Sequence, residues 1–267
     1  MNLWQTIFLA ILQGTTEFLP VSSSGHLVLL PYVLGWPDTG LALNVMLHLG
    51  SVIAIIAYFW HDLWALARAA WDSLRQRSLA DPQARLAWQL ACATVPAAVI
   101  GVLFEDFFEA LFGYPRAAAV FLLGTAAMIL LAEYIGRRVH HLDSMTWKHA
   151  LAIGLAQTLA ILPGLSRSGS TISAGLLLGY RRDEATRFSF LLAIPIILGS
   201  GGYKLLEFIG TETATPFGIM LIGLVVSAVT SYLAIAGLLA IVRRNSLWPF
   251  AAYCTLLSLS VLTGLLG

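Results

Sequence analysis

Long apolar runs separated by short polar segments dominate this chain of 267 residues. Six of the runs approach the ~20 residues that an α-helix needs to cross a bilayer. They lie at about 43–61, 87–104, 117–135, 186–206, 217–241 and 248–266. The strands of a membrane β-barrel would instead alternate in polarity over about ten residues. The pattern therefore predicts an all-α integral membrane protein with six transmembrane helices, folded as a single membrane domain over residues 1–267.

Two further apolar segments, 6–35 and 149–179, are each interrupted in the middle by a polar stretch that contains glycine and proline. As α-helices, their arms of about 12 to 14 residues would be ~18 to 21 Å long, which is short of the ~30 Å hydrocarbon core. We therefore expect each segment to form a re-entrant helical hairpin, which enters the membrane and returns to the side that it came from.

Composition supports this class and excludes others. The chain is 58% hydrophobic and 11% charged, whereas soluble domains are roughly 25% charged. A formal net charge of +1 cannot supply the basic surface that nucleic-acid binding requires. Cys92 and Cys254 both lie in apolar stretches, where we expect buried thiols rather than metal ligands or a disulfide.

Arginine and lysine are distributed unevenly between the segments that separate the predicted spans. One side of the membrane receives twelve of them, which are Arg68, Arg75, Arg77, Arg85, Arg137, Arg138, Lys148, Arg181, Arg182, Arg187, Arg243 and Arg244. The other side receives only Arg116 and Lys204. The positive-inside rule places the first set in the cytoplasm. We therefore expect both chain termini, and the entrance of the first hairpin, to face the periplasm or exterior.

The two interrupted segments share a pattern. A shift of 144 positions places Gln13 on Gln157, Ser22 on Ser166, Ser24 on Ser168, Gly25 on Gly169 and Gly35 on Gly179. This match predicts two repeats, residues 1–135 and 149–267, each a hairpin followed by three spans. Because three is odd, the second repeat inserts upside down, as in transporters with inverted repeats. The two hairpin tips then meet inside the membrane and line one polar site.

The first tip, LPVSSSGH, begins two residues after a carboxylate and contains a helix start. Gln13 and Glu17 are four residues apart and share a helix face, and Pro20 helps to end that helix. Ser22, Ser23 and Ser24 offer capping oxygens for the helix that follows. The N-terminus of such a helix attracts anions, phosphate above all.

The second tip, PGLSRSGS, repeats this design with Arg167 at the position of Ser23. Arg167 is flanked by Ser166, Ser168 and Gly169. A guanidinium binds phosphate through paired N–H donors and stays charged at any depth. Two helix N-termini, an arginine, several hydroxyls, a histidine and a carboxylate in one place are typical of phosphoryl transfer rather than of passive conduction.

The residues alone do not assign the individual roles. A nucleophile needs a hydroxyl or imidazole with a base nearby, and the first tip offers Ser22, Ser23, Ser24 and His26 beside Glu17. Glu17 could equally hold a divalent cation that bridges phosphate oxygens. A third possibility is a purely structural pair between Glu17 and an arginine of the second tip.

Other polar residues have simpler interpretations. We expect Asn44 and His48, which are spaced i and i+4, to pack between helices, and the histidines of residues 140–149 to lie at the surface. Arg68 and Arg182 are interpreted as topology signals that also contact anionic lipid.

The two motifs together carry a resemblance to a known family. "QGTTEFLPVSSSGH" followed by "PGLSRSGST" resembles the undecaprenyl-diphosphate phosphatases associated with bacitracin resistance. Their signatures are an acidic residue or Gln, three residues, Glu, and a serine-rich PVSSSGH-like tip, followed later by a PGxSRSG tip. The order of the motifs, the length and the hydropathy agree along the whole chain.

The resemblance implies a multi-pass enzyme of the bacterial plasma (inner) membrane that acts on a polyprenyl diphosphate lipid. It would remove the terminal phosphate of undecaprenyl diphosphate and so recycle the lipid carrier for peptidoglycan synthesis. It implies Glu17, Ser23, His26 and Arg167 as catalytic residues, with phosphate binding by Ser22, Ser24, Gly25, Ser166, Ser168 and Gly169. It also implies a divalent cation, Mg²⁺ or Ca²⁺, on Glu17 and possibly Gln13.

The mechanism expected from this is attack by Ser23, activated by His26 or Glu17, on the terminal phosphorus. Many family members have Glu where this chain has Gln13, so Glu17 is the sole acid of the motif here. By the charge distribution, the site faces the periplasm or exterior.

Two other classes of function compete with an enzyme. A lipid-carrier flippase or secondary transporter would use the same inverted repeat. A channel with the serine tips as its filter is a weaker alternative, because a filter has no use for a carboxylate and a histidine beside a fixed arginine. The GLLLG stretch at 175–179 would allow close helix contacts in a homodimer.

Overall fold

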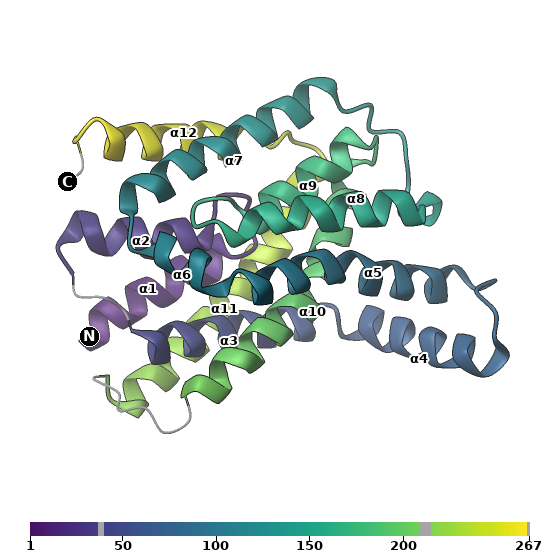
Figure 1. Ribbon diagram of the computed structural model, residues 1–267, viewed down its shortest axis with the longest axis horizontal. Helices are drawn as coiled ribbons and strands as arrows, with labels where there is room; N and C mark the ends of the chain where they lie inside the picture. The colour runs from purple at the N-terminus through teal and green to yellow at the C-terminus, as the bar shows by residue number, and fades with distance from the viewer. Residues whose placement is uncertain (37–39, 209–214, 266–267) are drawn as a thin grey trace.

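The computed structural model describes residues 1–36, 40–208 and 215–265 and is helical throughout, without a β-strand in those ranges (Figure 1). The first half contains α1 (Leu3–Thr16), α2 (Ser23–Leu34), α3 (Leu41–Tyr58), α4 (Trp60–Gln76), α5 (Pro82–Leu103), α6 (Glu105–Phe112) and α7 (Pro115–Ile135). The second half contains the 3-10 turn η1 (Leu142–Ser144), α8 (Trp147–Thr158), η2 (Leu159–Ile161), α9 (Arg167–Leu177), α10 (Arg182–Phe208), α11 (Phe217–Val242) and α12 (Trp248–Leu262). The prediction of an all-α membrane protein is confirmed at this level.

Four helices are long and apolar enough to cross a membrane, namely α5, α7, α10 and α11. Each contains one of the predicted spans. The pair formed by α3 and α4 is a fifth candidate if it counts as one bent span. The last predicted span, 248–266, corresponds to α12, which has 15 residues and is shorter than the ~20 that a straight crossing requires; residue 266 lies outside the described ranges. The sixth span remains a prediction.

The charged segment after the first predicted span is a helix rather than a simple connection. Beyond Phe59 the chain turns by 75° and continues as α4. This helix is amphipathic, and its face with Leu66, Ala69 and Ser73 is buried where α4 packs on α5. The charges on the opposite face interrupt the apolar residues along the sequence, so α4 is not a long apolar run, although its apolar positions repeat with the helical period.

Both interrupted segments are pairs of helices that break at the predicted motifs. α1 and α2 are separated by residues 17–22, and α8 and α9 by η2 and residues 162–166. α1 packs against α11, and α8 packs against α5, so each first arm lies on a helix of the other half. Gly14 and Gly154 permit this approach, because a Cβ there would lie 2.6 Å from the Ser227 carbonyl oxygen and 2.3 Å from the Ala93 carbonyl oxygen, respectively.

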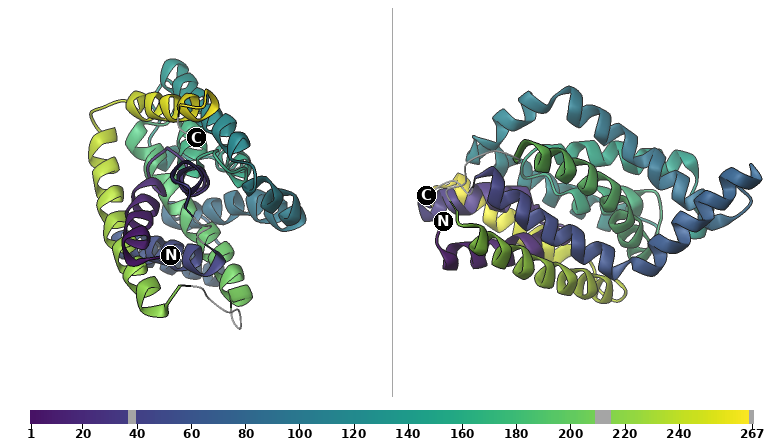
Figure 2. Two further views of the ribbon diagram at one scale, coloured as in Figure 1. Left: turned by 90° about the vertical axis from the view of Figure 1, so that its left-hand side faces the viewer. Right: turned by 90° about the horizontal axis from the view of Figure 1, so that it is seen from below.

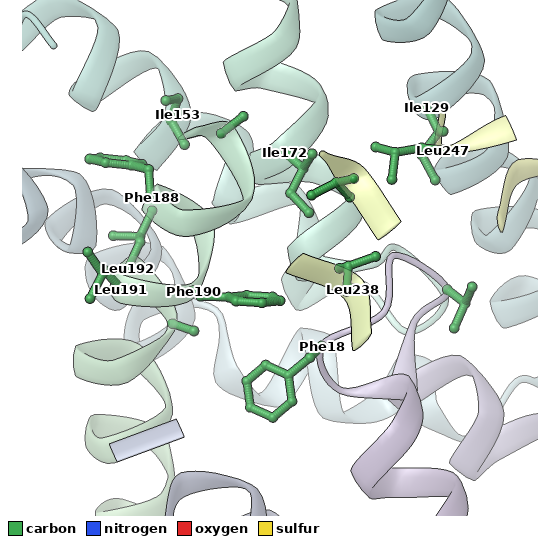
Figure 3. Packing of buried hydrophobic residues seen from close by; sticks show 14 of the residues in the cluster. Phe18, Ile129, Ile153, Ile172, Phe188, Phe190, Leu191, Leu192, Leu238 and Leu247 are labelled. Atoms are coloured by element: carbon green, nitrogen blue, oxygen red, sulfur yellow. The ribbon is translucent and has the colours of Figure 1, made fainter. Parts of the chain in front are cut away.

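The break in the first hairpin is anchored in the main apolar core. Phe18 is fully buried, and its ring meets that of Phe190 edge-on with centroids 5.5 Å apart (Figure 3). Phe190 also packs against Phe59, at the bend between α3 and α4. Because Phe18 directly follows Glu17 in the chain, this anchor fixes the position of the only carboxylate in the first motif.

The two termini lie at the same end of the molecule (Figures 1 and 2), while the connection between α4 and α5 extends furthest in the opposite direction. Helices α3, α5, α7 and α12 run largely along the axis that joins these two ends, whereas α11 crosses it obliquely (Figures 1 and 2). This arrangement brings the two hairpin breaks together between the ends.

Candidate active site

Each hairpin break is closed by a serine that caps the following helix. The Oγ of Ser22 accepts a hydrogen bond from the Gly25 N–H at 3.2 Å, and the Oγ of Ser166 accepts one from the Gly169 N–H at 3.0 Å. The glycine N–H groups expected to bind phosphate are therefore used by the caps. The earlier N–H groups of each first turn have no acceptor within their helix, so they are the ones that remain for an anion.

The two tips are in direct contact. The Ser168 hydroxyl donates a hydrogen bond of 2.9 Å to the Leu19 carbonyl oxygen, which joins the second tip to the first. A Cβ on Gly25 would lie 3.1 Å from the Cα of Gly164, so the two backbones approach closely at this point. The meeting of the tips that the sequence predicts is therefore seen in the structure.

Glu17 is the centre of this contact and is only 8% exposed. The Ser23 hydroxyl donates to its Oε2 at 2.6 Å, and the Gln13 side-chain amide donates to the same oxygen at 2.9 Å. Arg167, on the other tip, donates from one terminal nitrogen to Oε1 at 3.2 Å. Breaking a buried ion pair of this kind from one side costs about 3–5 kcal/mol, so the pair also ties the tips together.

A small cavity of about 180 Å³ opens beside these residues. Its polar lining is Glu17, Ser22, Ser23, Ser24, His48, Ser166, Arg167 and Ser200, and its apolar wall is Ala160, Leu165, Ile196 and Ile197. Glu17 is the one carboxylate among these lining residues. The second terminal nitrogen of Arg167 is buried and has no hydrogen-bond partner in the described ranges, so it can bind an anion in the cavity.

His26 is held away from this cavity. It is 3% exposed, and its Nδ1 lies 2.7 Å from the Ser22 carbonyl oxygen, to which it donates. Its Nε2 then accepts from the Tyr253 hydroxyl, also at 2.7 Å. Both ring nitrogens are thus occupied, whereas the Ser23 hydroxyl is bonded to Glu17. Of the two activating residues predicted for Ser23, the geometry favours Glu17.

His26 supports the backbone of the first tip instead. Ser22 has φ of 67°, a left-handed conformation that is unfavourable for a residue with a Cβ. The hydrogen bond from His26 holds the carbonyl of that same residue. The remaining predicted site hydroxyls form close pairs, Ser22 with Ser24 at 3.2 Å and Ser166 with Ser168 at 3.1 Å.

Sequence reasoning missed His48 as a site residue. We interpreted it as a packing residue, but it lines the cavity, and its Nε2 lies 3.9 Å from Oε2 of Glu17. Its Nδ1 donates to the Asn44 carbonyl oxygen at 2.8 Å, which leaves Nε2 directed at the carboxylate. The signal was a pair of polar residues, four apart, within an otherwise apolar run.

A second buried carboxylate, Glu133, was also missed. It is 6% exposed, and Arg182 donates to both of its carboxylate oxygens, at 2.8 and 2.5 Å. Arg138 pairs with it at 2.7 Å, and the Leu247 N–H donates to it at 2.8 Å. The interpretation of Arg182 as a topology signal alone was therefore incomplete, because this residue ties the end of α7 to the start of α10.

One histidine of the 140–149 segment also differs from expectation. His149 is half-buried rather than a free surface residue, and its Nδ1 lies 2.9 Å from the Tyr180 hydroxyl. Tyr180 itself is buried at the start of α10. Burial raises the pKa of the Tyr180 hydroxyl, so this hydroxyl stays protonated and available as a donor.

The chain matches the family described as Bacitracin resistance protein BacA over residues 6–260. Similar curated proteins include an undecaprenyl-diphosphatase of Alcanivorax borkumensis, 42% identical over 262 residues, which are 98% of this chain and 98% of the relative. Another, from Rubrobacter xylanophilus, is 46% identical over 260 residues, or 95% of this chain and 94% of the relative. A third, from Pelobacter propionicus, is 44% identical over 255 residues, or 95% and 93%.

The resemblance based on two short motifs is thereby confirmed over nearly the full length, which includes both tips, the cavity between them and the helices that position them. The chain belongs to the bacitracin resistance protein BacA family.

Proposed function

We propose that this protein hydrolyses undecaprenyl diphosphate to undecaprenyl phosphate and inorganic phosphate within the membrane. The relatives named above carry this activity in their names. The observation that carries the proposal is the hydrogen bond from Ser23 to Glu17 in a cavity that Arg167 also lines, with a second terminal nitrogen that has no partner in the described ranges. A nucleophile, its base and an anion-binding cation are thus preassembled.

In the first step, Oγ of Ser23 attacks the terminal phosphorus while its proton passes to Glu17. A bond forms between Oγ and phosphorus, and the bond from phosphorus to the bridging oxygen breaks. Undecaprenyl phosphate leaves with that oxygen. Undecaprenyl phosphate takes up the proton from Glu17 as it leaves, which restores the carboxylate. In the second step, water attacks the phosphoserine while its proton passes to Glu17. The bond between Oγ and phosphorus breaks, Glu17 returns the proton to Ser23, and inorganic phosphate is released. Glu17 accepts a proton in each attack, and the 2.6 Å contact is within the range for such transfer.

Arg167 and the first turns of α2 and α9 stabilise the charge that develops on the phosphoryl oxygens. One terminal nitrogen of Arg167 holds Glu17 and the other is free to donate to phosphate. Preorganised donors of this kind in a site with little water supply a large part of the rate enhancement in many enzymes. Arg167 is therefore both a positioning group for the base and a ligand for the substrate.

The residues also fit a divalent cation that arrives with the diphosphate. Mg²⁺ typically binds through one or two carboxylates and the phosphates of its substrate, and Glu17 is the carboxylate available. Oε1 of Gln13 is buried without a partner in the described ranges and is the candidate for a second oxygen. Ca²⁺ takes 6–8 oxygen ligands, so this set suits Mg²⁺ better. The cation would neutralise diphosphate charge.

We further propose the arrangement in the membrane. Six spans and two re-entrant hairpins form an inverted-topology repeat over residues 1–135 and 149–267, in a bacterial inner membrane. The reciprocal packing of α1 on α11 and of α8 on α5 supports the repeat, and the termini at one end support an even number of crossings. The positive-inside rule directs the site to the periplasm or exterior.

The decisive experiment is phosphate release from undecaprenyl diphosphate by the purified full-length protein in detergent, with and without EDTA. We expect chelator-sensitive release that is lost in Glu17→Ala and Arg167→Ala. Because detergent abolishes any gradient, a flippase or transporter would release no phosphate under these conditions. Absence of release from well-folded protein supplied with Mg²⁺ or Ca²⁺ would overturn the proposal in favour of transport, which a vectorial assay in sealed liposomes would then measure.

A further inference from the structure

A larger groove lies away from both hairpin tips, between the end of α4, the first half of α5 and the start of α8. Its volume is about 560 Å³, which is within the ~300–1,000 Å³ of sites that bind small molecules. None of the predicted catalytic residues lines it. The groove therefore needs an explanation separate from the phosphatase activity.

One wall of the groove is an apolar stripe along α5. Trp88, Cys92 and Val95 line the groove and are spaced i, i+4 and i+7, which places them on one face of the helix. The stripe extends for about 10 Å along the axis. Because α5 is one of the candidate membrane spans, this wall runs in the direction of a lipid chain.

This wall is held in place by hydrogen bonds. The indole nitrogen of Trp88 donates to the Ser73 hydroxyl at 3.0 Å, and Ser73 donates to the Ala70 carbonyl oxygen at 2.7 Å. Trp147, at the start of α8, lines the opposite side. Tryptophan is enriched where hydrocarbon meets lipid headgroups, so the two indoles mark the interfacial end of the groove.

A single cation lines the groove at that end. Arg77 follows α4 and precedes the start of α5, and no lining residue is acidic. Arg77 is exposed and forms no ion pair with any carboxylate of the described residues. The hydroxyl of Ser78, which also lines the groove, accepts from the Ala80 N–H and keeps its own hydrogen for donation. Both groups suit a phosphate oxygen.

The backbone conformation at Arg77 is also unusual. Its φ is 50°, the left-handed conformation at a helix end where glycine is the usual residue. An arginine there is not the residue that the backbone favours, so its side chain requires a separate reason. The helix C-terminus and the positive-inside bias both favour a basic residue there, and this one also lines the apolar groove.

We propose that this groove binds a membrane phospholipid with an anionic headgroup of the phosphatidylglycerol type. The phosphate lies on Arg77 and Ser78, and one acyl chain lies along the Trp88, Cys92 and Val95 stripe. Arg75 lies in the last turn of α4, two residues before Arg77, and is also exposed, but it does not line the groove. The proposal does not depend on the phosphatase activity, so the two can fail separately.

Cys92 reports on occupancy of the groove. It is partly exposed, whereas Cys254, the only other cysteine, is fully buried. The experiment measures the rate at which a maleimide alkylates Cys92 in the purified full-length protein in detergent, as phosphatidylglycerol, phosphatidylcholine or undecaprenyl phosphate is added. We expect phosphatidylglycerol to slow the reaction at concentrations where phosphatidylcholine does not. A Cys254→Ala protein confirms that the signal comes from Cys92.

A matched pair of variants tests the headgroup contact. Arg77→Gln is expected to weaken protection by phosphatidylglycerol about fivefold, the contribution of one basic residue near an anionic lipid surface, while Arg75→Gln leaves it unchanged. Arg77→Gly is expected to lose protection to the same extent and yet to keep or raise the thermal stability, because it relieves the left-handed residue.

Three outcomes would overturn the proposal. Equal protection by phosphatidylcholine would show that the groove has no headgroup preference. Equal protection in the Arg75 and Arg77 variants would show that the guanidinium does not bind the lipid. Stronger protection by undecaprenyl phosphate would assign the groove to the carrier lipid instead.

Discussion

The two hairpin tips share the same arrangement of helix-capping serines. In each, a serine caps the second helix through the N–H of a glycine three residues later, Ser22 with Gly25 and Ser166 with Gly169. In each, that serine also pairs with the serine two positions further on. The shared part breaks each helix and satisfies its backbone, and it supplies neither the proposed base nor the proposed nucleophile.

The chemistry lies where the tips differ. A shift of 144 positions places Glu17 on Ile161 and Ser23 on Arg167. In the proposed mechanism the base and nucleophile come from the first tip and the guanidinium from the second, and Arg167 joins the two tips by its contact with Glu17. The two tips thus share their capping serines but differ in the side chains at matched positions, and together they form one site where they meet. Equivalent changes in the two halves should therefore have very different effects.

The largest effect is expected from Glu17→Gln, which keeps the shape of the side chain but removes the base. Loss of a general base lowers turnover by about 10²–10⁴-fold. The variant also leaves Arg167 buried without its countercharge, so thermal stability should fall as well. Phosphate release and a melting curve on the same preparation measure both. Ile161→Val, at the matched position of the second tip, is the control and should retain turnover; equal losses in both variants would show a packing effect.

Arg167→Lys should reduce turnover by about 10²-fold, the loss typical of one oxyanion-stabilising donor. Lysine keeps the charge, but it cannot hold Glu17 and donate to phosphate from two fixed nitrogens at once. Kinetics with varied substrate separate the contributions, and we expect the loss mainly in kcat. A loss confined to KM would mean that Arg167 only binds substrate in its ground state.

A smaller effect is expected from the residues that support the backbone of the first tip. Ser22 is left-handed whereas Ser166 has an ordinary extended backbone, with φ of −71°, and only the first tip has a histidine behind it. Tyr253→Phe removes the hydrogen bond to His26, which should lower the free energy of unfolding by about 1 kcal/mol and leave kcat nearly unchanged. A large drop in kcat without loss of stability would instead make His26 part of the chemistry.

Whether a feature of this site can be predicted from the sequence depends on how far apart along the chain the interacting residues lie. Helix breaks and caps are local, and the serine and glycine spacing predicts them. α4 does not stand out among the long apolar runs because charged residues interrupt its apolar positions along the sequence, although those positions repeat with the helical period. The contact of His48 with Glu17 depends on how α3 packs beside the first hairpin, and Glu133 finds Arg182 49 residues away. Such contacts are properties of tertiary packing, which no periodicity encodes.

The smallest effect is expected from Gln157, and its contrast with Gln13 is the sharpest test of the comparison. Gln13 donates to Glu17. Gln157 occupies the equivalent position and is 2% exposed, but both of its amide atoms lack a partner in the described ranges, because the second tip has Ile161 in place of a carboxylate. An unpaired buried amide is unfavourable.

Gln157→Leu should therefore leave the free energy of unfolding unchanged or raise it by up to about 1 kcal/mol. Gln13→Leu should lower it by roughly 1.5–3 kcal/mol, because it removes a hydrogen bond to a charged group. Chemical unfolding in detergent measures both variants on one scale. If Gln157→Leu proved as damaging as Gln13→Leu, the second tip would have to contain a polar partner for Gln157, and the proposed functional difference between the two tips at this position would fail.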